Sequence, residues 1–316
     1  MATTVIDDGL PVAVPDSGSP LRTQRSGENR AGWLLSAPFI VFYLIFLIGP
    51  ALYGILMSFF NTTSVKSGLG AAVGLANYRE VLTSSAFWGS MGHTLWFTVL
   101  TTPPLVILAF VFAILAERIR RGRALVRFIF FAPFVMPVTS VTMIFGWLFT
   151  AQIGLFPKWL SDIGISPPNF LGTTGWSFIT VALLTVWWTV GFNFVLFLAG
   201  LQEIPTEVYE AAAIDGSTPR KTMWSITMPL LRPTIVLVTM LQILASLQIF
   251  NQMYLMTGGG PGTSTRPVME FIYDYGFSDY RAGYAAAATM VYFVIVLVVS
   301  LVWFVLRRQT RKTVGA

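Results

Sequence analysis

The chain has 316 residues, of which 55% are hydrophobic and only 11% are charged, and its formal net charge is +6. Soluble domains usually carry about a quarter charged residues, so this composition excludes an ordinary soluble globular protein. The absence of cysteine excludes disulfides, thiolate metal sites and a cysteine nucleophile, and the single histidine, His93, is too few for a histidine zinc site. No stretch matches the phosphate-binding pattern GxxxxGK[ST], so the sequence offers no nucleotide site of its own.

In chain order, the sequence begins with a polar stretch and continues with long apolar segments. Residues 1–31 are rich in polar residues and arginine, which predicts a disordered tail. Residues 32–316 form one membrane domain, because a helix needs about 20 apolar residues to cross a bilayer and six segments are long enough. These segments are approximately 33–60, 94–116, 125–149, 176–200, 234–256 and 284–306. The Pro103-Pro104 pair is predicted to break the second segment.

The basic residues indicate the orientation of these segments. Six spans place both termini on one side of the membrane, and fifteen of the 20 Lys and Arg residues lie on that side. Cytoplasmic loops carry such an excess, so both termini are predicted to be cytoplasmic, in the inner membrane of a bacterium. Because the bases cluster at the ends of apolar segments, they predict membrane orientation and not nucleic-acid binding. The predicted fold is an all-α membrane protein with six transmembrane helices.

The polar stretch 203–233 carries the signals of two short helices. Pro205 suits the first turn of a helix, where its missing N–H costs nothing, and Gly216 suits the left-handed residue that ends one. A second helix is predicted to start at Thr218 and to end before Pro229. One face of the first helix carries Val208, Ala211, Ala212 and Asp215. The stretch is predicted to lie outside the bilayer, with an alanine-rich face that another protein could approach closely.

The same stretch resembles a known signature. The run Glu210-Ala-Ala-Ala-Ile-Asp-Gly216, followed by Ile226-Thr-Met-Pro229, is similar to the cytoplasmic loop of bacterial ABC-importer permeases. In that family the loop is a coupling helix that docks into the ATP-hydrolysing subunit. The resemblance implies an ATPase-coupling role for Glu210, Ala211, Ala212, Asp215, Gly216 and Pro229. The alternative interpretation is an ordinary capped amphipathic helix in a loop.

Polar side chains inside two apolar segments predict a substrate pathway. Residues 187–194 and 246–252 contain amides, hydroxyls and aromatic rings at positions where a bilayer makes polar groups costly. Amides donate and accept hydrogen bonds without carrying charge, and aromatic faces can stack on sugar rings. No charge lies at the centre of a span, which favours a neutral, hydroxyl-rich solute. The alternative is that these polar groups only join helices to one another, as Thr189, Asn193, Gln242, Gln248 and Asn251 could do.

Further motifs resemble the permeases of maltose-type carbohydrate importers. The similar stretches are Gly191-Phe-Asn, Leu198 to Pro205, Tyr254 to Pro261 and Gly283-Tyr-Ala-Ala-Ala287. The resemblance implies sugar contacts from the spans on either side of the coupling loop. The resulting substrate-pathway residues are Thr189, Gly191, Asn193, Phe194, Ser246, Gln248 and Phe250, to which the polar pattern adds Asn251. Thr189 and Ser246 replace expected asparagines, which argues against maltose itself.

The resemblance also implies partners. These are a second homologous permease subunit, two ATP-binding subunits that hold ATP and Mg, and an extracytoplasmic solute-binding protein that delivers the sugar. The chain itself is then a transport subunit and not an enzyme, with no cofactor of its own. A glycerol-3-phosphate or polyol importer is an alternative within this class. A secondary transporter, from a different class, would need an ionisable residue buried in a span, and no charged residue lies at the centre of a predicted span.

Overall fold

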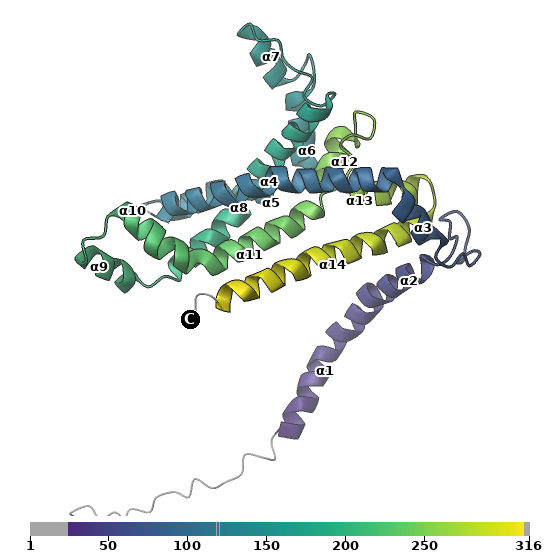
Figure 1. Cartoon of the computed structure of the whole chain (residues 1–316), viewed down its shortest axis with the longest axis horizontal. Helices are drawn as coiled ribbons and strands as arrows, with labels where there is room; N and C mark the ends of the chain where they lie inside the picture. Colours follow the sequence, from purple (N-terminus) through teal and green to yellow (C-terminus); the bar gives the residue numbers. More distant parts are fainter. Residues whose placement is uncertain (1–24, 118, 120, 313–316) are drawn as a thin grey trace, which may run out of the picture. The chain divides into compact units, whose positions relative to one another are not determined.

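The structure, a computed structural model, describes residues 25–117, 119 and 121–312 (Figure 1). Residues 1–24 of the predicted tail lie outside the described residues, while residues 25–31 begin helix α1, Arg25–Tyr43. The chain divides into two compact units at Gly54. The described residues contain no β-strand, only one isolated antiparallel bridge between Phe60 and Ala72.

The N-terminal unit is a single apolar helical stretch. Helix α1 continues through a π-helical turn, η1, Leu44–Ile48, into α2, Gly49–Met57. Together they give a 26-residue candidate membrane span, Gly32–Met57. Pro38 lies inside α1 without ending it.

The second unit, from Ile55 onward, holds the other helices. In chain order they are α3 Ala76–Thr83, α4 Ser85–Glu117, α5 Arg123–Val135, α6 Val138–Phe149, α7 Leu155–Asp162, α8 Thr174–Gln202, α9 Thr206–Ile214, α10 Pro219–Thr222, the π-helical turn η2 Met223–Thr227, α11 Met228–Leu247, α12 Asn251–Thr257, α13 Val268–Tyr273, the π-helical turn η3 Asp274–Ser278, and α14 Ala282–Lys312.

Helix α4 lies at the centre of this unit. It packs against both α8 and α11, and α11 packs against α14, so that α4, α11 and α14 run side by side (Figure 1). Leu105 and Phe197 belong to the apolar cluster between α4 and α8, while Phe87 and Phe271 belong to the cluster between α4 and α13. Small residues allow such helices to approach closely, because a Cβ on Gly200 would lie 2.5 Å from the hydroxyl oxygen of Thr234 on α11.

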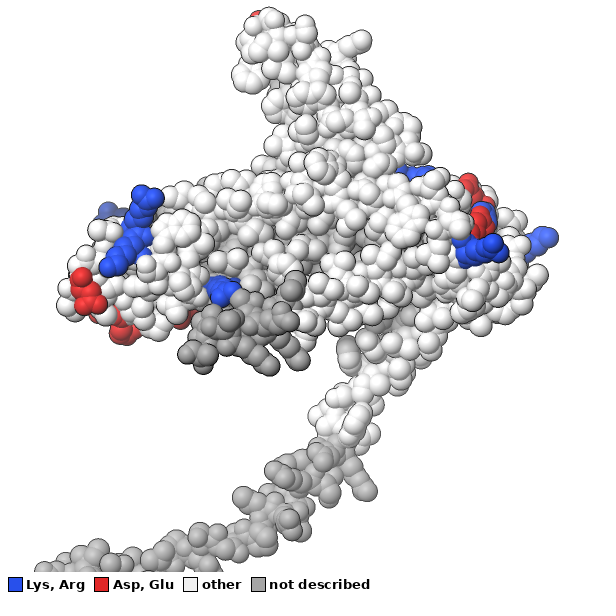
Figure 2. All heavy atoms as spheres, viewed as in Figure 1, with Lys and Arg blue, Asp and Glu red and all other residues white. Residues whose placement is uncertain are grey.

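The structure confirms the predicted fold class. Five helical stretches are long and apolar enough to cross a membrane, and the bent pair of α5 and α6 raises the count to six. On the face shown in Figure 2, charged side chains gather around α9–α10 and around α3, with largely uncharged surface between them. An uncharged belt between two charged ends suits a protein embedded in a bilayer. The orientation of the termini stays a prediction.

Two helix ends that were predicted from prolines are wrong. The predicted break at Pro103-Pro104 is wrong, because α4 runs unbroken from Ser85 to Glu117. The two prolines remove two main-chain hydrogen bonds, but the helix is held on both sides of them by burial, as Thr101 and Leu105 show. The third predicted span is instead sharply bent, with 88° between α5 and α6, and Pro137 stands at the bend.

The predicted end of the second loop helix before Pro229 is also wrong. The helix runs on through Pro229 and Pro233, and Pro219–Leu247 forms one 29-residue span. The preceding turn is π-helical, with the Met228 N–H bonded to the Met223 carbonyl, and such local adjustment compensates for the missing proline N–H. The fifth span ends at Leu247 and not near 256, because the helix breaks there before α12 begins.

Candidate functional site

The helix break after Leu247 creates the candidate site. Residues 248–250 connect α11 to α12, and Phe250 has φ −144° and ψ −66°, outside the helical region. The hydroxyl of Tyr292 on α14 donates a hydrogen bond to the carbonyl oxygen of Leu247. A main-chain acceptor freed by the break therefore has a partner, as a helix interruption within a membrane requires.

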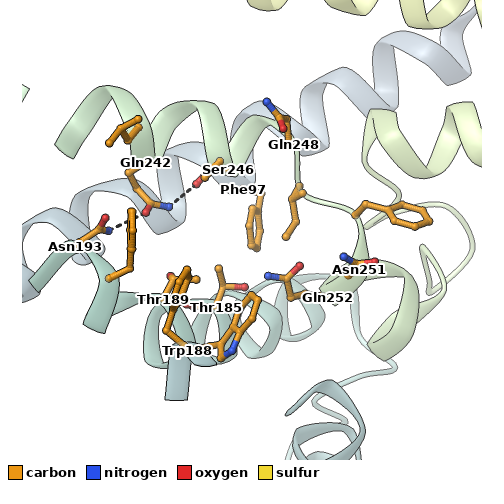
Figure 3. A pocket seen from close by; sticks show the side chains of 16 residues that line it. Phe97, Thr185, Trp188, Thr189, Asn193, Gln242, Ser246, Gln248, Asn251 and Gln252 are labelled. Atoms are coloured by element: carbon orange, nitrogen blue, oxygen red, sulfur yellow. Dashed lines mark hydrogen bonds between the residues drawn. The ribbon is translucent and has the colours of Figure 1, made fainter. Parts of the chain in front are cut away.

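A cavity of about 260 Å³ lies beside this break (Figure 3). Residues from α4, α5, α8, α11, α12 and the connection between the last two helices line it. They are Phe97, Phe134, Thr185, Trp188, Thr189, Phe192, Asn193, Leu241, Gln242, Ala245, Ser246, Gln248, Ile249, Phe250, Asn251 and Gln252. Apolar and aromatic walls with a few amides and hydroxyls are typical of a small-molecule site.

One wall of the cavity carries a chain of buried hydrogen bonds. The Asn193 Nδ2 donates to Gln242 Oε1 at 2.8 Å, and Gln242 Nε2 donates to Ser246 Oγ at 3.0 Å. Ser246 Oγ lies 3.1 Å from Thr101 Oγ1, which also donates to the carbonyl of Phe97 at 2.8 Å. This series of hydrogen bonds joins α8, α11 and α4, so these polar groups hold the three helices in register. Figure 3 shows Asn193, Gln242 and Ser246 along one wall, with Trp188 and Gln252 on the other.

Aromatic side chains form much of the remaining wall. The ring of Phe134 stacks on Phe192 at 5.1 Å between centroids and lies 5.8 Å from Trp188. The indole N–H of Trp188 donates to the carbonyl of Met136, at the bend between α5 and α6. These contacts fix the indole orientation, so this part of the cavity wall is a fixed aromatic surface.

Six of the eight predicted substrate-pathway residues line this cavity, namely Thr189, Asn193, Ser246, Gln248, Phe250 and Asn251. The structure places Gly191 and Phe194 elsewhere, in the packing of α8 on α5. A Cβ on Gly191 would lie 1.9 Å from the carbonyl oxygen of Phe130, and Phe194 is fully buried with its ring 5.0 Å from that of Phe130. Both face the neighbouring helix and not the cavity.

Sequence reasoning missed several cavity residues. Thr185 lines the cavity but resembled an ordinary helical threonine, and its hydroxyl does donate to the carbonyl four residues earlier. Gln252 is buried on α12. The predicted span 234–256 had placed it on the same straight helix as Ser246. Trp188 and Gln252 lie within the stretches 187–194 and 246–252 that predicted the pathway, but neither was selected as a pathway residue.

A buried carboxylate on α13 was also missed. Glu270 is 2% exposed, and burial raises its pKa to about 7, with a further upward contribution from Asp274 and a downward one from Arg266. The Arg266 guanidinium approaches Asp274 at 3.4 Å. Within the described part of the chain, Glu270 Oε2 and Arg266 Nε have no hydrogen-bond partner.

Five of the six predicted coupling residues lie on α9 or directly after it, and Pro229 lies at the start of α11. Glu210, Ala211 and Asp215 are exposed, while Ala212 is buried against the chain itself. The predicted face of Val208, Ala211, Ala212 and Asp215 is therefore partly exposed to solvent and partly buried. Gly216 has φ +67°, the left-handed conformation that glycine adopts without strain.

The neighbouring surface of this loop is apolar as well as exposed. Ile214, at the end of α9, is 87% exposed, and Trp224 in η2 is also exposed. The Thr218 hydroxyl accepts a hydrogen bond from the Lys221 N–H and caps α10. Pro229 is exposed early in α11. Such apolar groups on a charged surface are typical of a protein interaction site.

Comparison with known proteins is consistent with this geometry. The family described as "Binding-protein-dependent transport system inner membrane component" matches residues 106–312. The "Trehalose/maltose transport system permease protein MalF" of Thermococcus litoralis is 33% identical over 285 residues, covering 90% of this chain and 96% of the relative. The "Sulfoquinovosyl glycerol transport system permease protein SmoG" of Agrobacterium fabrum is 31% identical over 278 residues, covering 88% of this chain and 90% of the relative.

A solved structure shares the fold over nearly the same range. It is a chain of a bacterial ABC transporter involved in the import of the acidic polysaccharide alginate, with a TM-score of 0.77 and 25% identity. The match covers 90% of this chain and 99% of that one. The chain therefore belongs to the family of binding-protein-dependent transport system inner membrane components, as a multi-pass permease of a sugar ABC importer that has no ATPase site of its own.

Proposed function

We propose that this permease imports a neutral sugar or oligosaccharide, forms half of the translocation pathway and couples to a separate ATPase subunit through the loop 203–233. The observation that carries the substrate class is the cavity at the helix break. Its described lining offers amides, hydroxyls and aromatic faces but no Lys, Arg, Asp or Glu. A buried anion would need a cationic partner or dense hydrogen bonding, so this lining favours an uncharged solute.

The remaining half of the pathway and the motor belong to partners in this proposal. A second homologous permease subunit faces the cavity, two ATP-binding subunits hold ATP and Mg, and an extracytoplasmic solute-binding protein delivers the sugar. The similarity to a permease named for trehalose and maltose supports the neutral class. The loop 203–233 would then lie in the cytoplasm with both termini.

The second candidate is an anionic solute. Relatives named for sulfoquinovosyl glycerol and for alginate act on acidic compounds, and a partner permease could supply the positive charge. The lining of this chain does not favour it, but the two candidates predict opposite results with one panel of probes.

The test is sugar import by the whole complex in proteoliposomes with its solute-binding protein. Trehalose and the malto- and arabino-oligosaccharides are the neutral probes, and glycerol 3-phosphate and sulfoquinovosyl glycerol are the anionic ones. We expect import of a neutral probe, reduced by Asn251→Ala and unchanged by Ser300→Ala, a polar control on α14. Import of only anionic probes would overturn the neutral assignment.

Coupling is tested at the exposed residues of α9. Glu210→Lys reverses an exposed charge, and Gly216→Pro cannot adopt the φ of +67° found there. We expect both variants to assemble in the membrane but to lose transport-linked ATP hydrolysis. Asp162→Lys is the matched charge reversal, because Asp162 is also exposed but ends α7, outside the loop 203–233. Normal coupled hydrolysis in both test variants would refute the role of this loop.

A further inference from the structure

Four aromatic side chains form a continuous row that starts at the cavity. Phe250 lines the cavity and stacks on Tyr254, one helical turn later in α12, with 5.2 Å between ring centroids. Tyr273 on α13 lies 5.4 Å from Phe250 and 5.2 Å from Tyr254. Phe277 in η3 stacks on Tyr273 at 5.1 Å. We name Phe250, Tyr254, Tyr273 and Phe277 the aromatic row.

The outer part of the row is accessible. Tyr254 is 38% exposed and Phe277 is 68% exposed, although buried aromatic residues surround the inner end of α13. Rings that served only to pack α12 on α13 would be expected to lie inside. The row therefore joins the cavity to the surface through apolar faces that a ligand can reach.

The row lies at the end of the bundle opposite the coupling loop. The Val268 N–H of α13 donates to the Thr94 hydroxyl, near the start of α4. The loop lies at the other end of the same helix, where Glu117 and Tyr209 line a common cavity. A solute that enters the cavity from the side away from the ATPase would meet the row first.

Carboxylates around the row set its polarity. The pKa of Tyr254 is raised, first by its hydrogen bond with Tyr273 and then by smaller contributions that include Asp274 and Glu270. Asp279 follows η3 directly, and Arg266 is drawn toward Asp274. The partly exposed Asp274 and the exposed Asp279 disfavour an acidic sugar and can accept hydrogen bonds from sugar hydroxyls, whereas Glu270 is buried.

We infer that the aromatic row is a sugar-binding subsite that extends the cavity and holds the additional rings of a neutral oligosaccharide longer than a disaccharide. The C–H faces of pyranose rings are apolar and stack on aromatic faces, while the hydroxyls of Tyr254 and Tyr273 and the nearby carboxylates meet the polar edges. This inference rests on the proposed function, since it names the length class of the same substrate.

The test replaces the most exposed ring and keeps its apolar character. Phe277→Leu preserves apolar contact but removes the flat aromatic face. Phe277→Tyr is the control, because it keeps that face. The readout is kcat/KM for import of neutral sugars of two, three and four units by the whole complex in proteoliposomes. Binding of the unloaded solute-binding protein is measured alongside it.

We expect Phe277→Leu to lower kcat/KM about three- to tenfold for three and four units, the range that one lost stacking contact gives, and less than about twofold for two units. Phe277→Tyr should stay near the wild type, and binding of the unloaded protein should not change. Equal values for Phe277→Leu and wild type at every length would overturn the subsite. An equal loss at every length, or weaker docking of the unloaded protein, would overturn it in favour of a protein contact. Failure of the wild type to import any neutral sugar would overturn the proposed function and this inference with it.

Discussion

The close approach of α8 to α5 gives the most direct quantitative prediction. A Cβ on Gly191 would lie 1.9 Å from the Phe130 carbonyl oxygen, 2.7 Å from the Phe130 carbonyl carbon and 3.0 Å from the Phe131 Cα. Real Cβ contacts essentially never fall below 3.0 Å, and the obstructing atoms are backbone, so the helices must separate by roughly 1 Å. Overpacking of this kind costs about 1–3 kcal/mol. Ala gains roughly 1 kcal/mol over Gly in helix propensity, which offsets part of this cost.

Subtracting this gain, we expect Gly191→Ala to lower the free energy of unfolding of the subunit by up to about 2 kcal/mol. The purified chain is unfolded in mixed micelles by increasing the concentration of a denaturing detergent, and circular dichroism measures the loss of helix. Gly175→Ala is the control on the same helix, because its Cβ would meet nothing within 4 Å. The control should be unchanged or more stable. If Gly191→Ala matched the control in stability but changed sugar affinity, Gly191 would be a pathway residue and the packing argument would be refuted.

Three further predictions concern polar groups. A double-mutant cycle of Asn193→Ala and Gln242→Ala should give a coupling energy of about 0.6 kcal/mol, which is typical of hydrogen bonds between membrane helices. A coupling energy of zero would contradict the hydrogen bond between these two side chains. Tyr292→Phe should lower unfolding free energy by about 1–3 kcal/mol, because it leaves the Leu247 carbonyl unpaired at the helix break; unchanged unfolding would argue against this contact. The folded pKa of Glu270, about 7, lies above its ordinary value of 4.5, so its stabilising effect is complete below pH 4.5 and is lost as pH rises through 7. Melting temperature should fall across that window, and Glu270→Gln should flatten the fall; an equally steep fall in the variant would assign the titration to another group.

The apolar segments were predictable because a bilayer imposes a minimum length on any span. Their ends were not predictable from the usual helix-breaking residues. The Pro103-Pro104 pair does not interrupt α4, whereas the break at Gln248 to Phe250 contains neither proline nor glycine. In a packed membrane bundle, neighbouring helices supply the missing contacts and hydrogen bonds, so tertiary structure decides where a helix ends.

The candidate site was predictable in residue type more than in position. Asn193 and Ser246 stood out because amides and hydroxyls are unusual within long apolar segments, and both line the cavity. Gly191 was misplaced because its sequence neighbours line the cavity, while its own face of α8 meets α5. Glu270 was missed because it lies in a polar segment that composition alone predicts to be exposed, although the structure buries it.

The break after Leu247 also allows the residues before it and the residues after it to move independently. The stretch Pro219–Leu247 is one uninterrupted 29-residue span, about 40 Å long at 1.5 Å per residue. It begins in the loop at α10 and ends beside the cavity, so a displacement of its first turn along the axis shifts Gln242 and Ser246 with it. Asn251 and Gln252, beyond the break, need not follow. Opposite walls of the cavity can therefore move apart while each helix stays intact.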